Sequence, residues 1–333
     1  MSEIRTTRWF DAHLDLAYLA LNGRDMLAPL RQVQIEQPGA AVTIPSLRDA
    51  AVATVLATIF VQPLNSAAPA ENGRWCYRTA DEAYACAEAQ LNIYDQWLAC
   101  GALIDARTSA HPRRAPGILL LMEGCACVRT LDDLNHFYQR GVRVISLTWT
   151  EANRWAAGNE ARGGLTQEGK SLLMRAAELG MVLDTSHLCE ESFFDALQSA
   201  QMPKIASHSN CRSLLPPARQ TPRNLSDRQI SELMAAGGVI GINLFSKFLA
   251  AGRAAIDDVI GHIEHISDLG GSMDGVGLGS DMDGGFDSHA LPRSLESHLE
   301  LPHLCDALSA RGISDADIAK FSHANWERFF TRR

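Results

Sequence analysis

The sequence predicts an α/β protein, and a single (β/α)8 TIM barrel is the simplest arrangement of its elements. Eight short apolar runs are followed by polar residues, and longer amphipathic stretches lie between them. Such alternation of strands and helices is typical of a parallel sheet. No Pro-rich or Ser-rich linker divides the 333 residues, and no repeat of fixed period is present. Two separate sheets would need a boundary that the chain does not offer.

The predicted strands are short and apolar, as buried parallel strands are. The run from Gly117 to Met122 is apolar throughout and then ends in Glu123. The other runs have the same character. In order along the chain, the eight predicted strands are residues 8–13, 52–61, 117–123, 142–149, 181–187, 204–208, 238–245 and 275–281.

The predicted helices follow from amphipathic spacing and from capping residues. Ser226 precedes Gln229 by three positions, which is the pattern of a capping box, and Thr166 precedes another apolar stripe. We expect one barrel domain over residues 1–333, with a C-terminal helical extension at about 295–330. The main predicted helices are residues 79–100, 131–140, 166–179, 190–200, 226–236 and 256–269.

The composition is that of an ordinary globular protein, with 46% hydrophobic and 21% charged residues. Disorder and collagen-like structure are excluded. The formal charge is −9, and lysine occurs only at Lys170, Lys204, Lys247 and Lys320. A basic face that binds a nucleic acid is therefore not expected.

The cysteines and the chain start predict the compartment. Eight cysteines are scattered without a CxxC motif, unlike the dense framework of a small disulfide-built secreted domain. The first ten residues lack an apolar signal segment, and no apolar run reaches the about 18 residues that cross a bilayer. We expect a cytoplasmic protein with reduced thiols and no membrane partner.

Chemically active side chains gather at the ends of the predicted strands. Asp11, His13 and Asp15 are two positions apart and so point to the same side of the first strand. Four later strands also end in His, Asp or Glu, so that five of the eight do. Because a barrel brings the carboxyl ends of its strands to one face, these side chains are expected to converge there. The later residues are Glu123, His187, His208 and Asp281.

Three imidazoles and three carboxylates suit zinc or another borderline divalent ion. Six such groups are too many for one tetrahedral ion with an open position. Two ions that share Glu123 as a bridging carboxylate account better for the number, because Glu123 ends a central strand. Asp281 is then free to move protons. The alternative is that these residues cap helices or anchor loops.

At this point the sequence resembles the membrane dipeptidase (renal dipeptidase) family, peptidase family M19, within the amidohydrolase superfamily. Six short motifs carry the resemblance, and they occur in the family's order over residues 11 to 284. They are Asp11-Ala-His13-Leu-Asp15, Leu121-Met122-Glu123-Gly124, Asp184-Thr-Ser-His187, Ser207-His208-Ser209-Asn210, Pro222-Arg223-Asn224-Leu-Ser-Asp227 and Gly279-Ser280-Asp281-Met282-Asp283-Gly284.

The resemblance implies a barrel of the metal-dependent hydrolase type with two Zn²⁺ ions, bridged by Glu123 and by a water or hydroxide. It implies that His13 and Asp15 bind one zinc, and that His187 and His208 bind the other. Asp281 matches the family's acid/base. Arg223 matches the arginine that holds the substrate's terminal carboxylate, a task that suits a guanidinium group. The resemblance also suggests a homodimer.

One position departs from the family pattern. The family usually has a His in a Leu-Thr-His stretch after the fourth strand, where it donates to the scissile carbonyl. Here Trp149 stands at that position in Leu147-Thr148-Trp149. An indole N–H can donate a hydrogen bond, but it carries no charge. Trp149 is expected either to contact the substrate or to pack at the barrel rim.

The sequence therefore predicts a binuclear zinc dipeptidase acting on dipeptides with an L- or D-residue at the second position. One alternative is a related hydrolase of another small amide with a carboxylate, such as an N-acyl amino acid. The other is a catalytically silent metal-binding protein, which Trp149 alone suggests. Histidines that do not end a predicted strand, among them His262, His265 and His298, are expected to lie outside the site.

Overall fold

Eight parallel strands form the centre of the computed structural model, which describes residues 7–64, 75–108 and 115–331. They follow one another in the order β10-β11-β1-β2-β6-β7-β8-β9. A parallel bridge between Ala206 and Ile240 joins the two ends and closes the barrel. The strands are β1 Trp9–Leu14, β2 Val52–Phe60, β6 Gly117–Glu123, β7 Val142–Ile145, β8 Val182–Asp184, β9 Lys204–Ile205, β10 Ile240–Ile242 and β11 Val276–Leu278.

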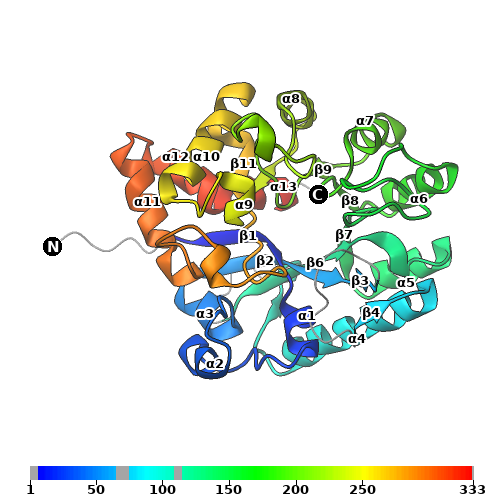
Figure 1. The fold of residues 1–333 in the computed structure, drawn as a ribbon. Helices are drawn as coiled ribbons and strands as arrows, with labels where there is room; N and C mark the ends of the chain where they lie inside the picture. The colour runs from blue at the N-terminus through cyan, green and yellow to red at the C-terminus, as the bar shows by residue number, and fades with distance from the viewer. Residues whose placement is uncertain (1–6, 65–74, 109–114, 332–333) are drawn as a thin grey trace.

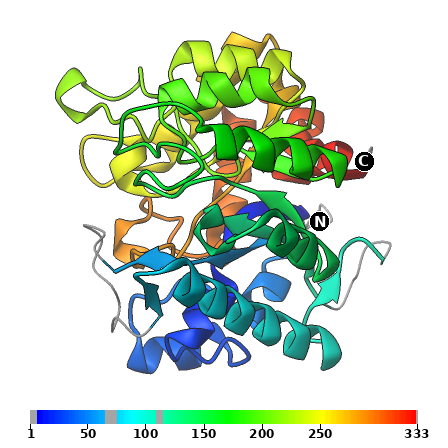
Figure 2. The ribbon, with the colours of Figure 1, turned by 90° about the vertical axis from the view of Figure 1, so that its right-hand side faces the viewer.

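The helices cover the outside of this barrel (Figure 1). Figures 1 and 2 both place α2, α3 and α4 on one side of the strands, and α8 and α10 on the opposite side. The helices are α1 Leu16–Leu21, α2 Leu30–Glu36, α3 Ile44–Asp49, α4 Ala80–Ala99, α5 Leu131–Gln139, α6 Gln167–Glu178, α7 Glu190–Ser199, α8 Asp227–Ala235, α9 Ser246–Leu249, α10 Ile256–Gly270, α11 Leu301–Ala310, α12 Asp315–Ala319 and α13 Asn325–Thr331. Three short strands lie outside the barrel path: β3 Gln62–Pro63, β4 Cys76–Tyr77 and β5 Ile104–Asp105.

The (β/α)8 prediction is confirmed, and all eight predicted strands and six predicted helices are present. The predicted capping groups act as expected, since Ser226 and Gln229 form a capping box and Thr166 accepts from the Gly169 amide. Most of the predicted strand ends were too late, although β6 ends at Glu123 as predicted and β1 extends one residue beyond its predicted end, to Leu14. The strand predicted to reach His187 stops at Asp184, because the chain then bends and gives His187 a positive φ of 67°.

The C-terminal part of the chain closes the bottom of the barrel. Trp326 and Phe329 of α13 are buried among inward-facing strand residues, and the Trp326 ring stacks on Phe10 at 5.9 Å. The indole N–H donates to the Leu278 carbonyl at 3.0 Å. Gly277 makes room for this ring, since a Cβ there would lie 2.3 Å from the indole nitrogen. The opposite end of the barrel is thus the one open to a ligand.

Within the described ranges, no helix combines the length and the apolar character needed to cross a membrane.

Candidate metal centre and active site

A cavity of about 680 Å³ opens at the carboxyl end of the barrel, and most of the predicted site residues line it. His13 lies in β1, and Asp15 is the residue before α1. Glu123 is the last residue of β6. The others lie in the loops that follow β7, β8, β9 and β11: Trp149, His187, His208, Arg223 and Asp281.

Glu123 lies at the centre of the cluster, and its two oxygens face different neighbours. One oxygen, Oε2, is 3.5 Å from His13 Nε2, and that same nitrogen is 3.9 Å from Asp15 Oδ1. The other oxygen, Oε1, is 3.1 Å from His187 Nε2 and 3.5 Å from His208 Nε2. The five side chains thus form two groups of three that share Glu123. The resemblance to peptidase family M19 implies the same two groups.

All three imidazoles present the same nitrogen to Glu123, because their other ring nitrogen is engaged elsewhere. Nδ1 of His13 and Nδ1 of His208 both contact the Ser207 hydroxyl, at 3.2 and 2.8 Å. Nδ1 of His187 lies 3.2 Å from Asn159 Oδ1. The Nε2 atoms of His187 and His208 are only 3.1 Å apart.

Burial and charge shift the pKa values in this cluster strongly. Burial lowers the pKa of His13, but Glu123, Asp15 and Asp281 outweigh it and raise that pKa to about 10. Burial and the Arg223 charge lower the pKa of His187 to about 4. For Glu123, the His13 and His187 contacts outweigh burial and hold its pKa well below the usual range. Perturbed values of this kind gather at functional sites.

Asp281 lies on the same cavity, at a sharp turn after β11. Its φ is 58°, and its Oδ2 accepts a hydrogen bond of 2.8 Å from the Asn243 side chain. Burial raises its pKa to about 8; Asp15 and Glu123 also raise it, although His13 lowers it. A carboxyl group with such a value can both hold and release a proton near neutral pH.

Gly284 lies directly against this carboxyl group. A Cβ at Gly284 would lie 1.8 Å from Asp281 Oδ1, so only glycine leaves the carboxylate in its place. Gly284→Ala is expected to displace Asp281 and to lower kcat, while the metal content stays unchanged. Gly285→Ala is a poor control because its φ is positive, whereas Gly252→Ala, with open space around it, is a suitable one. Equal kcat values in Gly284→Ala and Gly252→Ala would contradict this placement of Asp281.

Arg223 is held rigidly at the cavity wall. Its guanidinium donates to the Ser209 hydroxyl at 3.1 Å and to the His208 carbonyl at 2.7 Å. The side chain is buried, and its Nε has no partner within the described part of the chain. The pKa of Arg223 is lowered by burial. Arg223 lines the cavity, and a guanidinium group with so little contact with water is a suitable site for an anion.

Aromatic rings form two walls of the cavity. Trp149 is half-buried and packs edge-on to Phe60 at 5.2 Å, and its ring centre is 6.2 Å from that of His187. The second wall consists of Phe245, Phe248 and Phe286, which contact one another through Phe245. Phe248 lies 5.6 Å from the Arg223 guanidinium. Trp149 is thus placed both at the rim and on the cavity, so its role as a substrate contact stays a prediction.

Sequence reasoning missed the residues that hold the site residues in place. Asn159 lies in the loop after β7, where no pattern marks it, and Asn243 follows a strand that shows no charged end. His298 was predicted to lie outside the site, and it does not line the cavity. It is nevertheless fully buried and contacts Asp11 Oδ2 at 2.7 Å.

The chemistry of the cluster fits divalent cations. Within each of the two groups around Glu123, the potential ligand atoms lie within 4.8 Å of one another, and every residue is buried. The Nε2 atoms of His187 and His208 lie 3.1 Å apart and beside the carboxylate of Glu123. A cation bound between these atoms would accept their lone pairs. Imidazole and carboxylate are ligands that zinc accepts. The residues that would hold metal are His13, Asp15, Glu123, His187 and His208.

Comparison with known proteins identifies the family of this chain. Residues 3–332 match the family described as membrane dipeptidase (peptidase family M19). An uncharacterised protein of the pqqA 5′ region from Klebsiella pneumoniae is 36% identical over 209 residues, which are 59% of this chain and 74% of that protein.

Two solved structures share the fold over nearly the whole chain. One is a metallopeptidase from Rhodobacter sphaeroides liganded with a phosphinate mimic of the dipeptide L-Ala-D-Ala, with a TM-score of 0.81, 23% identity and coverage of 98% of this chain and 99% of that one. The other is the dipeptidase AC, a metallopeptidase of family M19, with a TM-score of 0.82, 25% identity and the same coverage. The chain therefore belongs to the membrane dipeptidase family, peptidase family M19, and is by that membership a metallodipeptidase.

Proposed function

We propose that this protein hydrolyses the peptide bond of dipeptides at a centre of two zinc ions. One observation carries the proposal: the two oxygens of Glu123 face two separate groups, His13 with Asp15 and His187 with His208. A carboxylate in that position suits a bridge between two ions. Asp281 and Arg223 line the same cavity, so a proton-transfer group and an anion site lie beside the centre.

Asp281, Arg223 and Trp149 would each have a separate role in the reaction. When bound, the zinc ions supply Lewis acidity and a nucleophile at neutral pH. Asp281, oriented by Asn243, accepts a proton from the attacking water and delivers it to the leaving amine. Arg223 binds the terminal carboxylate and so aligns the scissile bond with the centre. Trp149 contacts the part of the substrate on the other side of that bond.

The walls of the cavity indicate the substrate class. A substrate whose carboxylate lies on Arg223 has its second side chain near Phe248, 5.6 Å from the guanidinium. This favours apolar second residues. The phosphinate ligand of the Rhodobacter sphaeroides enzyme mimics a dipeptide with a D-residue at its second position. We therefore include D-residues at this position among the substrates.

A panel of L,L and L,D dipeptides tests the proposal directly. The zinc-loaded protein is incubated with each member, and released amino acids are measured. The expected result is release of both amino acids, with faster turnover for apolar second residues. Trp149 favours a second candidate, an N-acyl amino acid, because Phe60 and Trp149 offer an apolar wall to an acyl group. Turnover of acyl amino acids without turnover of dipeptides would select that candidate.

Arg223→Met is expected to raise KM for dipeptides by about 10- to 100-fold, since a hydrogen bond to a charged group contributes roughly 1.5–3 kcal/mol. Arg219→Met is the matched control, because Arg219 also lines the cavity but is exposed and donates to the Ala251 carbonyl. Dipeptide amides, which lack the carboxylate, give the second measurement. The wild type should discriminate against amides and Arg223→Met should not. An equal KM in the two variants would exclude Arg223 as the carboxylate site.

A further inference from the structure

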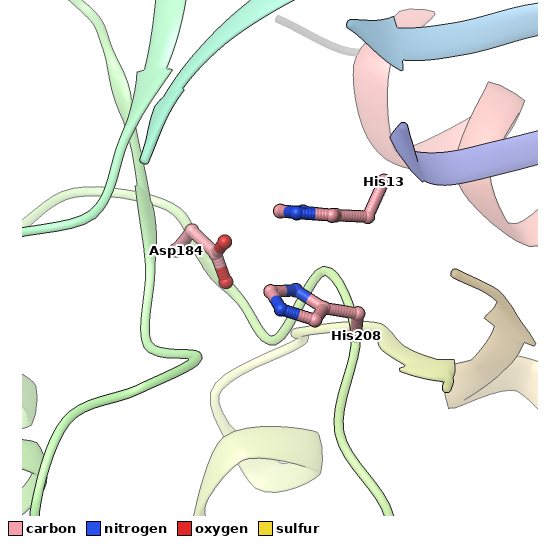
Figure 3. A group of neighbouring side chains, drawn as sticks. All are labelled: His13, Asp184 and His208. Atoms are coloured by element: carbon pink, nitrogen blue, oxygen red, sulfur yellow. The ribbon is translucent and has the colours of Figure 1, made fainter. Parts of the chain in front are cut away.

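The Ser207 hydroxyl contacts three buried side chains behind the proposed metal centre. It lies 2.6 Å from Asp184 Oδ2, 2.8 Å from His208 Nδ1 and 3.2 Å from His13 Nδ1. Figure 3 shows the Asp184 carboxylate pointing toward the two imidazoles, whose rings stack with their centres 3.6 Å apart. All four residues are at most 1% exposed, so water does not compete for these contacts.

The single proton of the Ser207 hydroxyl determines which partner donates in each of its hydrogen bonds. A hydroxyl has one proton to donate and two lone pairs to accept with, whereas an ionised carboxylate only accepts. The Ser207 proton therefore goes to Asp184 at 2.6 Å. The two lone pairs are left for the two nearest ring nitrogens, which must then both carry a proton. The remaining neighbour, the Ser186 hydroxyl, lies farther away at 3.4 Å.

His13, Asp184 and His208 could be taken for a third group of metal ligands, since their ligand atoms lie within 4.8 Å of one another. The contacts of Asp184 argue against this. Its Oδ1 accepts from the backbone amides of Ser186 at 3.0 Å and Ser207 at 2.8 Å, and its Oδ2 accepts from the Ser207 hydroxyl. Both oxygens are therefore engaged with the protein. Asp184 acts on Ser207 rather than on a metal.

The same arrangement recurs elsewhere in the barrel. Asp11 Oδ1 accepts from the amides of His13 and Ser280, and its Oδ2 accepts from the Ser280 hydroxyl. The strand registers also correspond: Asp184 pairs with Ile205, two residues before Ser207, and Asp11 pairs with Leu278, two residues before Ser280. In each case the serine precedes a site residue, His208 or Asp281.

Only one of the two serines contacts the imidazoles. The Ser280 hydroxyl donates to Asp11 and accepts from the Met282 amide, and within the described ranges it contacts no histidine ring. Close packing keeps Ser207 in its position, because a Cβ at Gly241 or Gly279 would lie 1.9 or 1.8 Å from the Ser207 carbonyl oxygen. The chain thus offers two serines that bond a buried aspartate in the same way, of which Ser207 also contacts His13 and His208.

We propose that Ser207 is a positioning residue for the metal centre: its hydroxyl, oriented by Asp184, holds His13 and His208 in the Nδ1–H form with Nε2 turned toward Glu123. The inference rests on the proposed function, because it takes these histidines to bind zinc. Partners of this kind, behind the ligands, fix the orientation and the tautomer of ligating histidines. One hydroxyl here serves a ligand from each of the two groups, so a single residue sets the geometry of both.

The first test needs no variant. In the zinc-loaded wild type labelled with ¹⁵N-histidine, nitrogen chemical shifts and couplings to the ring protons tell which ring nitrogen binds zinc. We expect His13 and His208 to bind through Nε2 and to show Nδ1 protons that exchange slowly with water. Zinc on Nδ1 of either residue would overturn the proposal.

The second test compares Ser207→Ala with Ser280→Ala by zinc competition against a chromogenic chelator. Ser207→Ala should weaken zinc binding by about 10- to 100-fold, whereas Ser280→Ala should keep the wild-type affinity. Equal losses in both variants would show that Ser207 acts only through folding, and would overturn the proposal. If Ser207→Ala does not fold, the nitrogen spectra decide alone. A wild type that shows these spectra but hydrolyses no dipeptide would refute the proposed function and leave this inference standing.

Discussion

Glu123→Gln is expected to remove zinc from the protein and with it all dipeptide hydrolysis. Glu123 is a member of both groups and contacts His13 through Oε2 and His187 and His208 through Oε1. An amide keeps the shape but loses the charge and half of the acceptor capacity. The loss in zinc affinity should exceed the roughly 10- to 100-fold that removing an outer partner costs. Metal analysis after dialysis measures it.

Glu160→Gln is the matched control for this variant. Glu160 lines the same cavity but is exposed and belongs to neither group. It should keep its zinc and its activity. If Glu123→Gln bound as much zinc as Glu160→Gln, the assignment of Glu123 as a bridge would be wrong.

Asp281→Asn is expected to lower kcat by about 10²- to 10⁴-fold, the usual contribution of a general acid or base. Zinc content should stay at the wild-type level, because Asp281 belongs to neither of the two groups around Glu123. The amide cannot take up or release a proton, although it can still contact Asn243. Measurement of kcat per active site, together with metal analysis, separates a loss of proton transfer from a loss of zinc. Full zinc with unchanged kcat would refute the acid/base role, and wild-type protein with zinc but no turnover would support a silent metal-binding protein.

The raised pKa of Asp281 gives the same variant a second readout. In the metal-free protein this pKa is about 8, against an ordinary value of 3.8, so the folded state binds the proton more tightly than the unfolded state. The stability that this proton contributes is present at low pH and is lost as the pH rises from about 4 to about 8. Metal-free Asp281→Asn should therefore unfold at a higher temperature than metal-free wild type at pH 9. A lower melting temperature for the variant would contradict this placement of the group.

Much of this site could be predicted from sequence because a barrel converts strand order into spatial proximity. His13 and Asp281 are far apart in the chain, yet β1 and β11 are neighbours and the Asp281 amide donates to the His13 carbonyl at 3.2 Å. The fold class and the convergence of the six chemically active residues follow from that rule. The ends of several strands could not be predicted in this way. His187 and Asp281 lie beyond their strands and have positive φ, which no apolar pattern indicates.

The residues behind the ligands could not be predicted in the same way. Ser207 acts through the directions of its one proton and two lone pairs, and Asp184 through a register shared with the neighbouring strand. Neither property has a signature in the sequence. His298 illustrates the same limit, because it contacts Asp11 although the two residues are 287 positions apart in the chain. Roles of this kind depend on side-chain geometry, which only a three-dimensional structure provides.

Zinc titration of chelator-treated protein tests the central claim most directly. Zinc is removed, added back in steps, and the release of free amino acids from an apolar L,D dipeptide is followed at each step. The account predicts no release from the metal-free protein, a rate that rises with added zinc, and a plateau at two ions per chain. Hydrolysis that persists after chelation, or a zinc-loaded protein that releases no amino acid from any dipeptide of the panel, would contradict it.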